Sequence, residues 1–579
     1  MLLKTVFVYG KIKKILYRGG TMYNFYAEFT KDGVSSGVNT AENNDFMFSL
    51  TEENGRIKGT ITAHADLTFR SLSLTAEREF GFNDLFYANG YQAWTTSREF
   101  CRSDKLRGIM PFSKVSKRTE DITGISGDYR FASYGKQGVF HSYTYCYFRK
   151  RGERTITLFG SKSECRGFTV FEADMNENTF KIYKDIEGLK LKKGDVYEVF
   201  DIIEINGEFD SVMDEYFFGF VGCKKPKVPH LSGYTSWYNY FQKINEQIIL
   251  RDLDGMDRAK EEVNIFQVDD GYESAVGDWL RVDGEKFPNG MKYIADKIHE
   301  KGYKAGIWLA PFNAQRNSAI LAAHPDWVIK DNETGKPLLG CIGWGGAYTF
   351  DIYNEEFRNY LKIVFDTYLG DWGYDMVKLD FLYSQCMQPR NGKTRGEIMC
   401  DAVDLLRSLC GDKLILGCGV PLGACMGIFD ACRIGPDATK EFAGPFYNKF
   451  GINCEVPSCE NAINNAIFRS HLDGRAFTND PDVFFLRNTN IKFNLEQKLL
   501  LGKINAVCGN VLFVSDNAGD YDEKTVDFLK AFFKEKDYKV TMAEYVSRDV
   551  ILLEFSEDGV QKSLKFNIKN GNSNIGKVV

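Results

Sequence analysis

Apolar and polar residues alternate in short segments over residues 1–225, as in YNFYAEFT, DFMFSLT and RTITLFG. An alternation with a period of two predicts strands that bury one face. Turn-forming residues stand between these segments, including Asp32-Gly33 and Asn54-Gly55, and Asn206-Gly207 is interpreted as a further turn. Strands at short spacing, without long helical segments between them, predict an N-terminal β-sandwich.

The hydrophobic pattern changes after Lys224–Pro229, KKPKVP, where charges and two prolines disfavour helix and strand and predict a linker. Beyond it, short apolar runs alternate with longer segments of helical period. We expect eight strands, at 233–238, 265–270, 303–311, 374–380, 413–419, 431–435, 475–480 and 510–516. This alternation predicts a central (β/α)8 TIM barrel. A ninth candidate strand, 347–352, is assigned to the long loop after the third strand.

The last segment combines a helical pattern over 523–536 with apolar strands at KVTMAEYV and VILLEFSED, which predict a small C-terminal β-element. A chain of 579 residues also exceeds what one hydrophobic core organises. The predicted fold class is therefore multidomain, α/β plus β. It consists of an N-terminal β-sandwich over 1–225, a catalytic (β/α)8 barrel over 226–520 and a C-terminal β-rich element over 521–579.

Charge and composition argue against several classes of protein. The net charge is −6 and no domain is strongly basic, so we expect no nucleic-acid partner. No run reaches the ~18 apolar residues of a membrane span, and the N-terminus lacks a signal-peptide pattern. Fourteen cysteines without close spacing indicate reduced thiols and a cytoplasmic location. Because no HExxH or CxxC spacing occurs, we expect neither a metal nor another cofactor, and the oligomeric state is left open.

Two aspartates stand where expected strands end. Asp380 closes the fourth strand, two residues after Lys378, and Asp437 follows the sixth. Active sites of (β/α)8 barrels lie at the carboxyl ends of the strands. A single aspartate there is often only a helix N-cap, and Asp480 and Asp482 are assigned this role. Since several other strands also end in titratable or aromatic side chains, we expect Asp380 and Asp437 to share one site.

Two carboxyl groups that flank one glycosidic bond are what glycoside hydrolysis requires. Lys378 is expected to keep Asp380 ionised, which suits a nucleophile, whereas Asp437 must hold a proton to act as an acid. Arg433 either binds a substrate hydroxyl, orients Asp437 or forms a structural ion pair. The pair Asp269–Asp270 has no cationic neighbour in the sequence and is predicted to bind hydroxyl groups, with a helix cap plus a metal ligand as the alternative.

Six motifs follow one another between residues 230 and 520: GYTSWY, QVDDGYE followed by GDW, GIWLAPF, KLDFLY, ILGCG and RIGPD. Together with NGYQAW upstream, they resemble the α-galactosidases of glycoside hydrolase family 36. The resemblance implies a retaining exo-hydrolase in which Asp380 is the nucleophile and Asp437 the acid/base. It also implies that Asp269 and Asp270 bind the outer hydroxyls of the sugar. The other residues of the implied substrate-binding site are Trp237, Trp308, Lys378, Cys418, Arg433 and, from the N-terminal domain, Trp94.

The sequence departs from the family at Tyr91, where a tryptophan is commoner, and in the loop CIGWGG (341–346), which has no clear counterpart. The favoured function is hydrolysis of terminal α-linked galactose from small oligosaccharides of the melibiose or raffinose type, through a covalent glycosyl-aspartate intermediate. One alternative is an α-N-acetylgalactosaminidase, or another retaining α-glycosidase that uses the same two aspartates. A second is a non-catalytic sugar-binding protein. Glycosyl transfer to a sugar instead of water also stays open.

Overall fold

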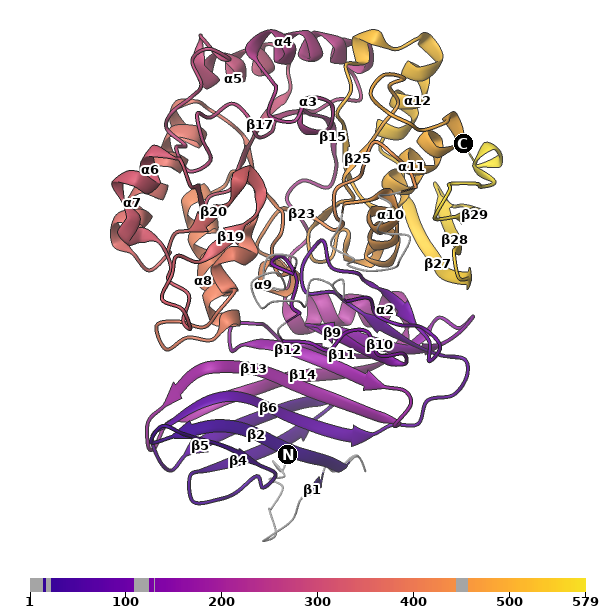
Figure 1. Ribbon diagram of the computed structural model, residues 1–579. Helices are drawn as coiled ribbons and strands as arrows, with labels where there is room; N and C mark the ends of the chain where they lie inside the picture. Colours follow the sequence, from indigo (N-terminus) through magenta and orange to yellow (C-terminus); the bar gives the residue numbers. More distant parts are fainter. Residues whose placement is uncertain (1–13, 17–21, 109–123, 130, 444–456, 579) are drawn as a thin grey trace.

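The computed structural model describes residues 14–16, 22–108, 124–129, 131–443 and 457–578. Figure 1 shows two β-sheets at the bottom, parallel strands surrounded by helices above them, and a small sheet near the C-terminus. Residues 1–13, part of the stretch in which no signal peptide was recognised, lie outside the described residues. No helix in the described ranges combines the length and the apolar character that a membrane span needs.

Two antiparallel sheets of seven strands form the N-terminal part. The first sheet has the order β1-β2-β6-β13-β12-β9, with β3 paired to β2, and the second has the order β4-β5-β14-β11-β10-β7-β8. The strands of the first are β1 (Lys14–Leu16), β2 (Met22–Lys31), β3 (Val34–Val38), β6 (Leu67–Glu77), β9 (Val139–Tyr143), β12 (Phe168–Asp174) and β13 (Thr179–Leu191). Those of the second are β4 (Phe46–Glu53), β5 (Arg56–Ala63), β7 (Asp84–Ala88), β8 (Arg98–Phe100), β10 (Tyr145–Lys150), β11 (Thr155–Ser161) and β14 (Val196–Glu208).

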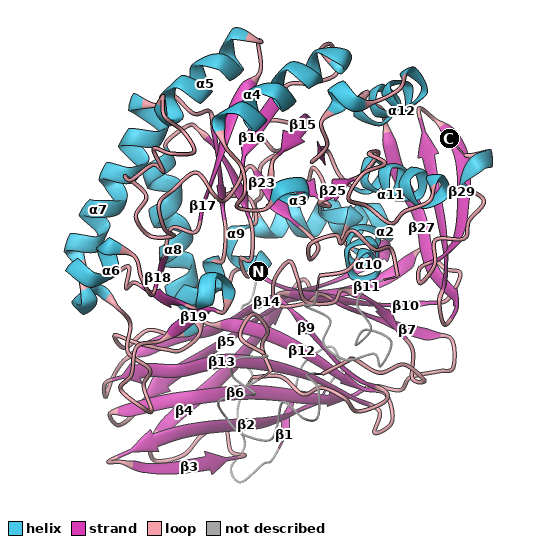
Figure 2. Cartoon of the chain, turned by 45° about the horizontal axis from the view of Figure 1, so that its top comes forward, coloured by secondary structure: helices cyan, strands magenta, loops and turns pink. Residues whose placement is uncertain are grey.

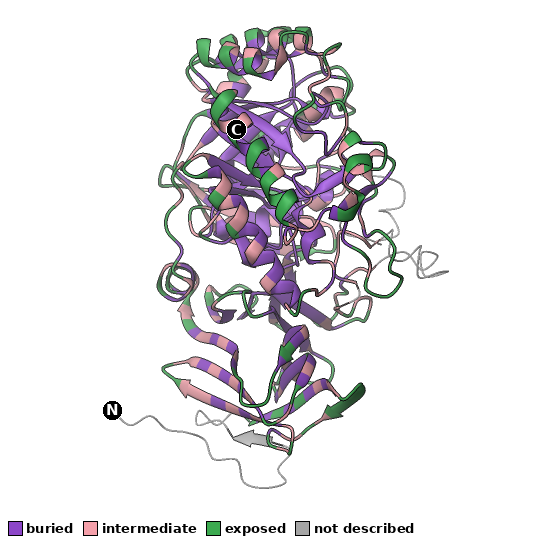
Figure 3. Ribbon diagram, turned by 90° about the vertical axis from the view of Figure 1, so that its left-hand side faces the viewer, coloured by how far each residue is buried: buried purple, intermediate pink, exposed green. Residues whose placement is uncertain are grey.

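Phenylalanine rings fill the space between these two sheets. The ring centroids of Phe25 and Phe48 lie 4.9 Å apart, and those of Phe29 and Phe46 lie 5.4 Å apart. Every second residue of β2 is buried from Tyr23 onward, and Figure 3 shows this alternation along the lower strands. The N-terminal sheets expected from the alternating pattern are therefore present.

The turn predicted at Asn206-Gly207 is wrong. Both residues lie inside β14, where Asn206 pairs with Thr157 and Gly207 pairs with Ile156 of β11. After β14 come α2 (Phe209–Asp214) and a π-helix, Glu215–Val221. Residues 222–230, which include the predicted linker, then form neither helix nor strand.

A parallel sheet with the order β24-β23-β22-β21-β17-β16-β15-β26-β25 follows. Its strands are β15 (Leu231–Thr235), β16 (Ile265–Val268), β17 (Lys304–Leu309), β21 (Met376–Leu379), β22 (Leu414–Gly417), β23 (Ala431–Arg433), β24 (Thr478–Asp480), β25 (Val483–Phe484) and β26 (Val511–Val514). Only Pro481 and Asp482 separate the two edge strands, β24 and β25, along the chain. The sheet must therefore curl round until its edges nearly meet.

Helices alternate with these strands and lie around them in Figure 2, as the strand–helix pattern predicted. They are α3 (Trp237–Tyr240), α4 (Glu246–Gly255), α5 (Gly290–Glu300), α6 (Ala319–Ala323), α7 (Glu355–Phe365), α8 (Arg395–Cys410), α9 (Leu422–Cys425), α10 (Cys459–Phe468), α11 (Leu495–Cys508) and α12 (Glu523–Phe533). Capping boxes begin α8 at Thr394 and α11 at Asn494. Each box satisfies amide groups that the first helical turn leaves without partners.

The ninth candidate strand is β20 (Ala347–Thr349), and it lies outside the parallel sheet, as expected. It pairs with β18 (Asn313–Gln315) and β19 (Leu339–Cys341) in a small sheet between β17 and β21. At the C-terminus, β27 (Tyr538–Ser547), β28 (Val550–Glu557) and β29 (Val560–Asn567) form an antiparallel sheet. The predicted multidomain architecture is thus confirmed in outline, whereas the boundaries at 225 and 520 stay a prediction.

Candidate active site

Asp380 follows the last residue of β21, a strand that is buried throughout. Its Oδ1 accepts a hydrogen bond of 2.7 Å from the backbone N–H of Phe381, and its Oδ2 accepts one of 3.2 Å from the indole N–H of Trp308. Burial raises the pKa of Asp380, and the positive charge of Lys378 and a hydrogen bond with Cys418 oppose that rise. Four of the predicted site residues, Asp380, Trp308, Lys378 and Cys418, are therefore brought together.

Lys378 forms its ion pair with Asp269, which corrects the prediction that Asp269 has no cationic partner. The distance from Nζ to Oδ2 is 2.8 Å, and both side chains are buried. Gln267 donates a second hydrogen bond of 2.8 Å to the same oxygen. Burial acts to lower the pKa of Lys378, but the Asp269 carboxylate outweighs it and the pKa is raised. The ammonium group thus stays charged and acts on Asp380 through space.

Asp270 belongs to a second hydrogen-bonded group. It accepts hydrogen bonds from Gln242 Nε2 at 3.0 Å and from the indole N–H of Trp344 at 2.8 Å. Burial raises the pKa of both Asp270 and Glu273, and for Glu273 the neighbouring Asp270 charge raises it further. The hydrogen bond between the two carboxyl groups acts to lower the pKa of Asp270 and to raise that of Glu273, so a shared proton favours Glu273. Glu273 stands in the QVDDGYE motif but was not assigned a role from the sequence.

Arg433, the last residue of β23, lies between two carboxylates. Its Nη2 is 2.7 Å from Asp437 Oδ1 and 3.1 Å from Asp482 Oδ2, and the hydroxyl of Tyr238 donates a hydrogen bond of 2.6 Å to Asp482. These contacts fit two of the alternatives given for Arg433, orientation of Asp437 and a structural ion pair. Asp482 precedes β25, so its assignment as a helix cap is wrong.

The pKa values of the two carboxyl groups beside Arg433 are shifted in opposite directions. Burial raises the pKa of Asp482 to about 7. Burial also acts to raise the pKa of Asp437, but the charge of Arg433 outweighs it and the pKa is lowered. The Asp437 side chain keeps 37 % of its surface exposed, whereas Arg433 keeps 1 %. A buried guanidinium thus holds an accessible carboxylate.

The charge of Asp437 acts on Asp380, although the strands that carry the two residues are far apart in the sequence. The negative charge of Asp437 contributes to the raised pKa of Asp380, and Lys378 contributes to the lowered pKa of Asp437. In the resting protein the proton therefore favours Asp380. This distribution is the reverse of the one that the roles predicted for the two residues require.

Trp94 comes from the N-terminal part and reaches the segment that follows Asp380. Its ring lies 5.3 Å from that of Phe381 and 5.8 Å from that of Tyr383. Trp237 begins α3 and packs against Phe241, with ring centroids 5.1 Å apart. Among the described residues, Trp237 forms no hydrogen bond with either aspartate, so its predicted place in the site rests on the resemblance alone.

The loop 341–346 contributes a residue that sequence reasoning missed. Besides its hydrogen bond to Asp270, Trp344 has its ring 5.9 Å from that of Trp308 and 5.2 Å from that of Phe381. Three glycines surround it in GWGG, a composition that predicts a turn and gives no sign of a side chain aimed at the site.

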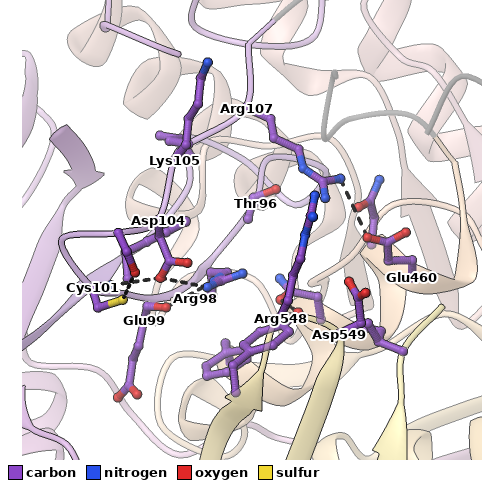
Figure 4. Close-up of a pocket in the computed structure, with 18 of the residues that line it drawn as sticks. Thr96, Arg98, Glu99, Cys101, Asp104, Lys105, Arg107, Glu460, Arg548 and Asp549 are labelled. Carbon is purple, nitrogen blue, oxygen red and sulfur yellow. Dashed lines mark hydrogen bonds and ion pairs between the residues drawn. The ribbon is translucent and has the colours of Figure 1, made fainter. Parts of the chain in front are cut away.

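A separate cavity of about 1670 Å³ lies between the segment Thr96–Gly108, α10 and the end of β27 with the turn that follows it (Figure 4). None of the predicted site residues is among the described residues that line it. Several of its charged side chains are already paired, Arg98 with Asp104 at 3.0 Å and Arg107 with Glu460 at 3.6 Å. The cavity is therefore distinct from the candidate active site.

Comparisons with known proteins point in the same direction as the geometry. The melibiase family model matches residues 235–398. Alpha-galactosidase 1 of Pediococcus pentosaceus is 28% identical over 170 residues, 27% of this chain and 22% of that protein. The A type blood alpha-D-galactosamine galactosaminidase of Flavonifractor plautii is 26% identical over 229 residues, 35% of this chain and 21% of that protein.

Two solved structures share the fold over most of the chain. The α-galactosidase TtGalA of Thermus thermophilus has a TM-score of 0.68 at 22% identity and covers 93% of this chain and 98% of that one. The family 36 α-galactosidase AgaA of Geobacillus stearothermophilus has a TM-score of 0.58 at 11% identity and covers 92% of this chain and 83% of that one.

The fold is thus shared with solved α-galactosidases, and a segment of the parallel-sheet region is similar to the melibiase family model and to curated glycoside hydrolases. The resemblance of the chain to the α-galactosidases of glycoside hydrolase family 36, which the motifs indicated, is confirmed. The aligned segments span about a fifth of the length of the two curated relatives. The substrate and the roles of individual residues are therefore matters of proposal.

Proposed function

We propose that the protein is a retaining, exo-acting α-galactosidase that hydrolyses terminal α-linked galactose from small oligosaccharides. Asp380 is the nucleophile and Asp437 is the acid/base. The observation that carries this proposal is that Asp380 and Asp437, two carboxyl groups from separate strands, both lie within reach of the Lys378 charge, and that the charge of Asp437 raises the pKa of Asp380. Direct attack by one carboxylate, with protonation by another across the same bond, is what retention requires.

In the first step, an oxygen of Asp380 attacks the anomeric carbon and forms a glycosyl ester. The bond to the leaving oxygen breaks, and Asp437 donates its proton to that oxygen. In the second step, Asp437 takes a proton from water, the water oxygen attacks the anomeric carbon, and Asp380 is released. The active form thus has Asp380 ionised and Asp437 protonated, whereas their surroundings raise the pKa of Asp380 and lower that of Asp437.

The other residues of the proposed site hold the sugar. Asp269 and Asp270 accept hydrogen bonds from its outer hydroxyls, and their fixed partners, Lys378 at 2.8 Å and Trp344 at 2.8 Å, support this role because they hold both carboxylates in place. Cys418 stands near the 2-position. The remaining members of the proposed substrate-binding set are Lys378, Arg433, Trp308, Trp237 and Trp94.

Two measurements test the proposal: the rates on two nitrophenyl glycosides and the anomeric configuration of the first product. We expect the protein to cleave 4-nitrophenyl α-galactoside faster than the corresponding α-N-acetylgalactosaminide, and we expect proton NMR to show α-galactose as the first product. Asp380→Asn is expected to lower kcat by about 10³-fold or more at unchanged fold, since the covalent step is lost. A preference for the acetamido sugar would favour the galactosaminidase alternative. Binding of galactose without turnover of any glycoside would favour the sugar-binding alternative.

We further propose that the chain divides into domains at residues 225 and 520, and that the N-terminal domain takes part in the site through Trp94. The contact between Trp94 and Phe381 supports this part. Trp94→Ala is expected to raise KM more than it lowers kcat, because the ring touches the residue beside the nucleophile and not the nucleophile itself. An unchanged KM would contradict it.

A further inference from the structure

Two bulky aromatic residues beside the aspartates have left-handed backbone conformations. Trp344 has φ 56° and ψ 27°, and Phe381 has φ 56° and ψ 33°. Side chains with a Cβ rarely adopt positive φ, and for bulky residues the conformation is strained. Such strain concentrates at functional sites, where the surrounding structure holds it in place. Neither residue has a role in the covalent steps proposed above.

The hydrogen bonds of these two residues explain how the strain is maintained. The backbone N–H of Phe381 donates to Asp380 Oδ1 at 2.7 Å. The indole N–H of Trp344 donates to Asp270 Oδ2 at 2.8 Å. The first bond fixes the backbone of Phe381 beside the proposed nucleophile, and the second fixes the ring of Trp344 beside a proposed sugar-binding group.

The two strained residues also contact each other and extend into a row of aromatic rings. The rings of Trp344 and Phe381 are 5.2 Å apart at an interplanar angle of 68°. Trp94 continues the row beyond Phe381, at 5.3 Å and 71°, and Trp308 continues it beyond Trp344, at 5.9 Å and 59°. Trp308 is 2% exposed, whereas the other three are only partly buried. The accessible part of the row therefore consists of Trp94, Phe381 and Trp344.

An unsatisfied donor lies at one end of this accessible part. The indole Nε1 of Trp94 is buried and has no hydrogen-bond partner among the described residues. Buried donors in folded proteins nearly always have partners, so an unsatisfied one calls for an explanation. A hydroxyl group of a bound ligand is an acceptor that would satisfy it.

From this row we infer a leaving-group subsite: Trp94, Phe381 and Trp344 form a platform that selects α-galactosides whose leaving group is a ring with a flat apolar face. The inference rests on the proposed function and deepens it. Aromatic rings cover apolar faces well, and the C–H face of a pyranose and the face of an aryl group share this property. The free Trp94 donor favours the pyranose, because a sugar also offers hydroxyl acceptors.

Three substrates with different leaving groups test the inference. They are melibiose, which releases a pyranose, 4-nitrophenyl α-galactoside, which releases an aryl group, and α-galactosyl fluoride, which releases no ring. Phe381→Ala and Trp344→Ala are expected to lower kcat/KM for melibiose and the aryl galactoside about tenfold more than for the fluoride, which corresponds to the loss of one aromatic contact. A loss confined to melibiose identifies the pyranose as the ligand, and equal losses for both ring substrates identify the shared apolar face.

Two further variants separate binding from structural damage. Trp344→Phe keeps a ring but removes the donor to Asp270, so it is expected to retain the preference for ring leaving groups while KM rises for all three substrates. Trp372→Ala is the matched control, because Trp372 also packs by ring stacking, with its centroid 4.4 Å from that of Tyr368, but lies outside the aromatic row. It is expected to leave the ratio between the three substrates as in the wild type.

Equal losses for all three substrates in Phe381→Ala and Trp344→Ala would overturn the inference and leave the proposed function standing. A wild-type protein that fails to cleave even α-galactosyl fluoride would instead overturn the proposed function, and the inference with it.

Discussion

The ammonium group of Lys378 lies 2.8 Å from Oδ2 of Asp269, across the end of the intervening strand β17. The ion pair fixes a proposed sugar-binding carboxylate, while the same positive charge lowers the pKa values of Asp380 and Asp437 through space. One buried lysine therefore influences both the sugar site and the two residues proposed to carry the chemistry. Removal of its charge should affect each of them in a predictable direction.

We predict that Lys378→Met shifts both limbs of the pH profile of kcat/KM to higher pH. Loss of the positive charge raises the pKa of Asp380, which must be ionised, and raises the pKa of Asp437, which must be protonated. The maximum of kcat/KM should also fall by about 100-fold or more, since Asp269 is left as an unpaired buried charge. The pH profile of kcat/KM for 4-nitrophenyl α-galactoside measures both shifts, and Lys378→Arg is the control that retains the charge. If both limbs of the Lys378→Met profile stay at their wild-type pH, the prediction is wrong.

The sequence was sufficient to place the principal carboxylates. Each of the eight expected strands has a counterpart in the parallel sheet, because short buried strands appear as apolar runs whatever surrounds them. Asp380 and Asp437 follow directly from those runs and from the rule that barrel sites lie at the carboxyl ends of strands. The partner of Lys378 could not be predicted in this way, since Asp269 is 109 residues away in sequence and only the curvature of the sheet brings it near.

Local signals failed where distant contacts outweighed them. Asn206-Gly207 has the composition of a turn, yet pairing with Thr157 and Ile156 keeps both residues in β14. Trp344 sits in a glycine-rich loop with no periodic pattern, so only the folded chain reveals its contact with Asp270. Both errors arise because tertiary contacts override local propensity, which is the usual weakness of arguments from a single sequence.

The stability of the protein should fall as the pH rises from about 4.5 to 7, in part because of Glu164. Its Oε2 accepts a hydrogen bond of 2.7 Å from the Thr169 amide, and its Oε1 has no partner among the described residues. Burial raises the pKa of Glu164 to about 7. Between about pH 4.5 and 7 the folded state therefore keeps a proton that the unfolded state has already lost. The stability that this proton contributes is fully present below about pH 4.5 and is lost as the pH rises to 7.

The glutamine variant isolates this contribution. A pKa shift of this size corresponds to a few kcal/mol, at about 1.4 kcal/mol per unit. Glu164→Gln should therefore show a smaller fall of the thermal midpoint between about pH 4.5 and pH 7 than the wild type. Glu172→Gln, on the neighbouring strand β12 and ion-paired to Lys181 at 3.4 Å, is the control. Identical slopes in the wild type and Glu164→Gln would show that this carboxyl does not cause the dependence.

The C-terminal sheet should depend on one buried arginine for its attachment to the N-terminal sheets. Arg149 donates hydrogen bonds to Glu99 at 2.6 Å and to Glu544 of β27 at 2.8 Å, and all three side chains are buried. Arg149→Met leaves the buried Glu99 carboxylate without its ion pair and leaves Glu544 only its longer contact with Arg151 at 3.8 Å, which is expected to cost about 3–5 kcal/mol of stability. Arg56→Met is the matched control, because Arg56 pairs with Asp201 inside the second N-terminal sheet while keeping 42% of its side chain exposed, and such pairs contribute at most about 1 kcal/mol. Thermal unfolding measures the difference, and amide exchange should show faster opening of β27 in Arg149→Met alone. Equal losses in Arg149→Met and Arg56→Met would mean that the buried position of Arg149 gives it no special role in holding the sheet.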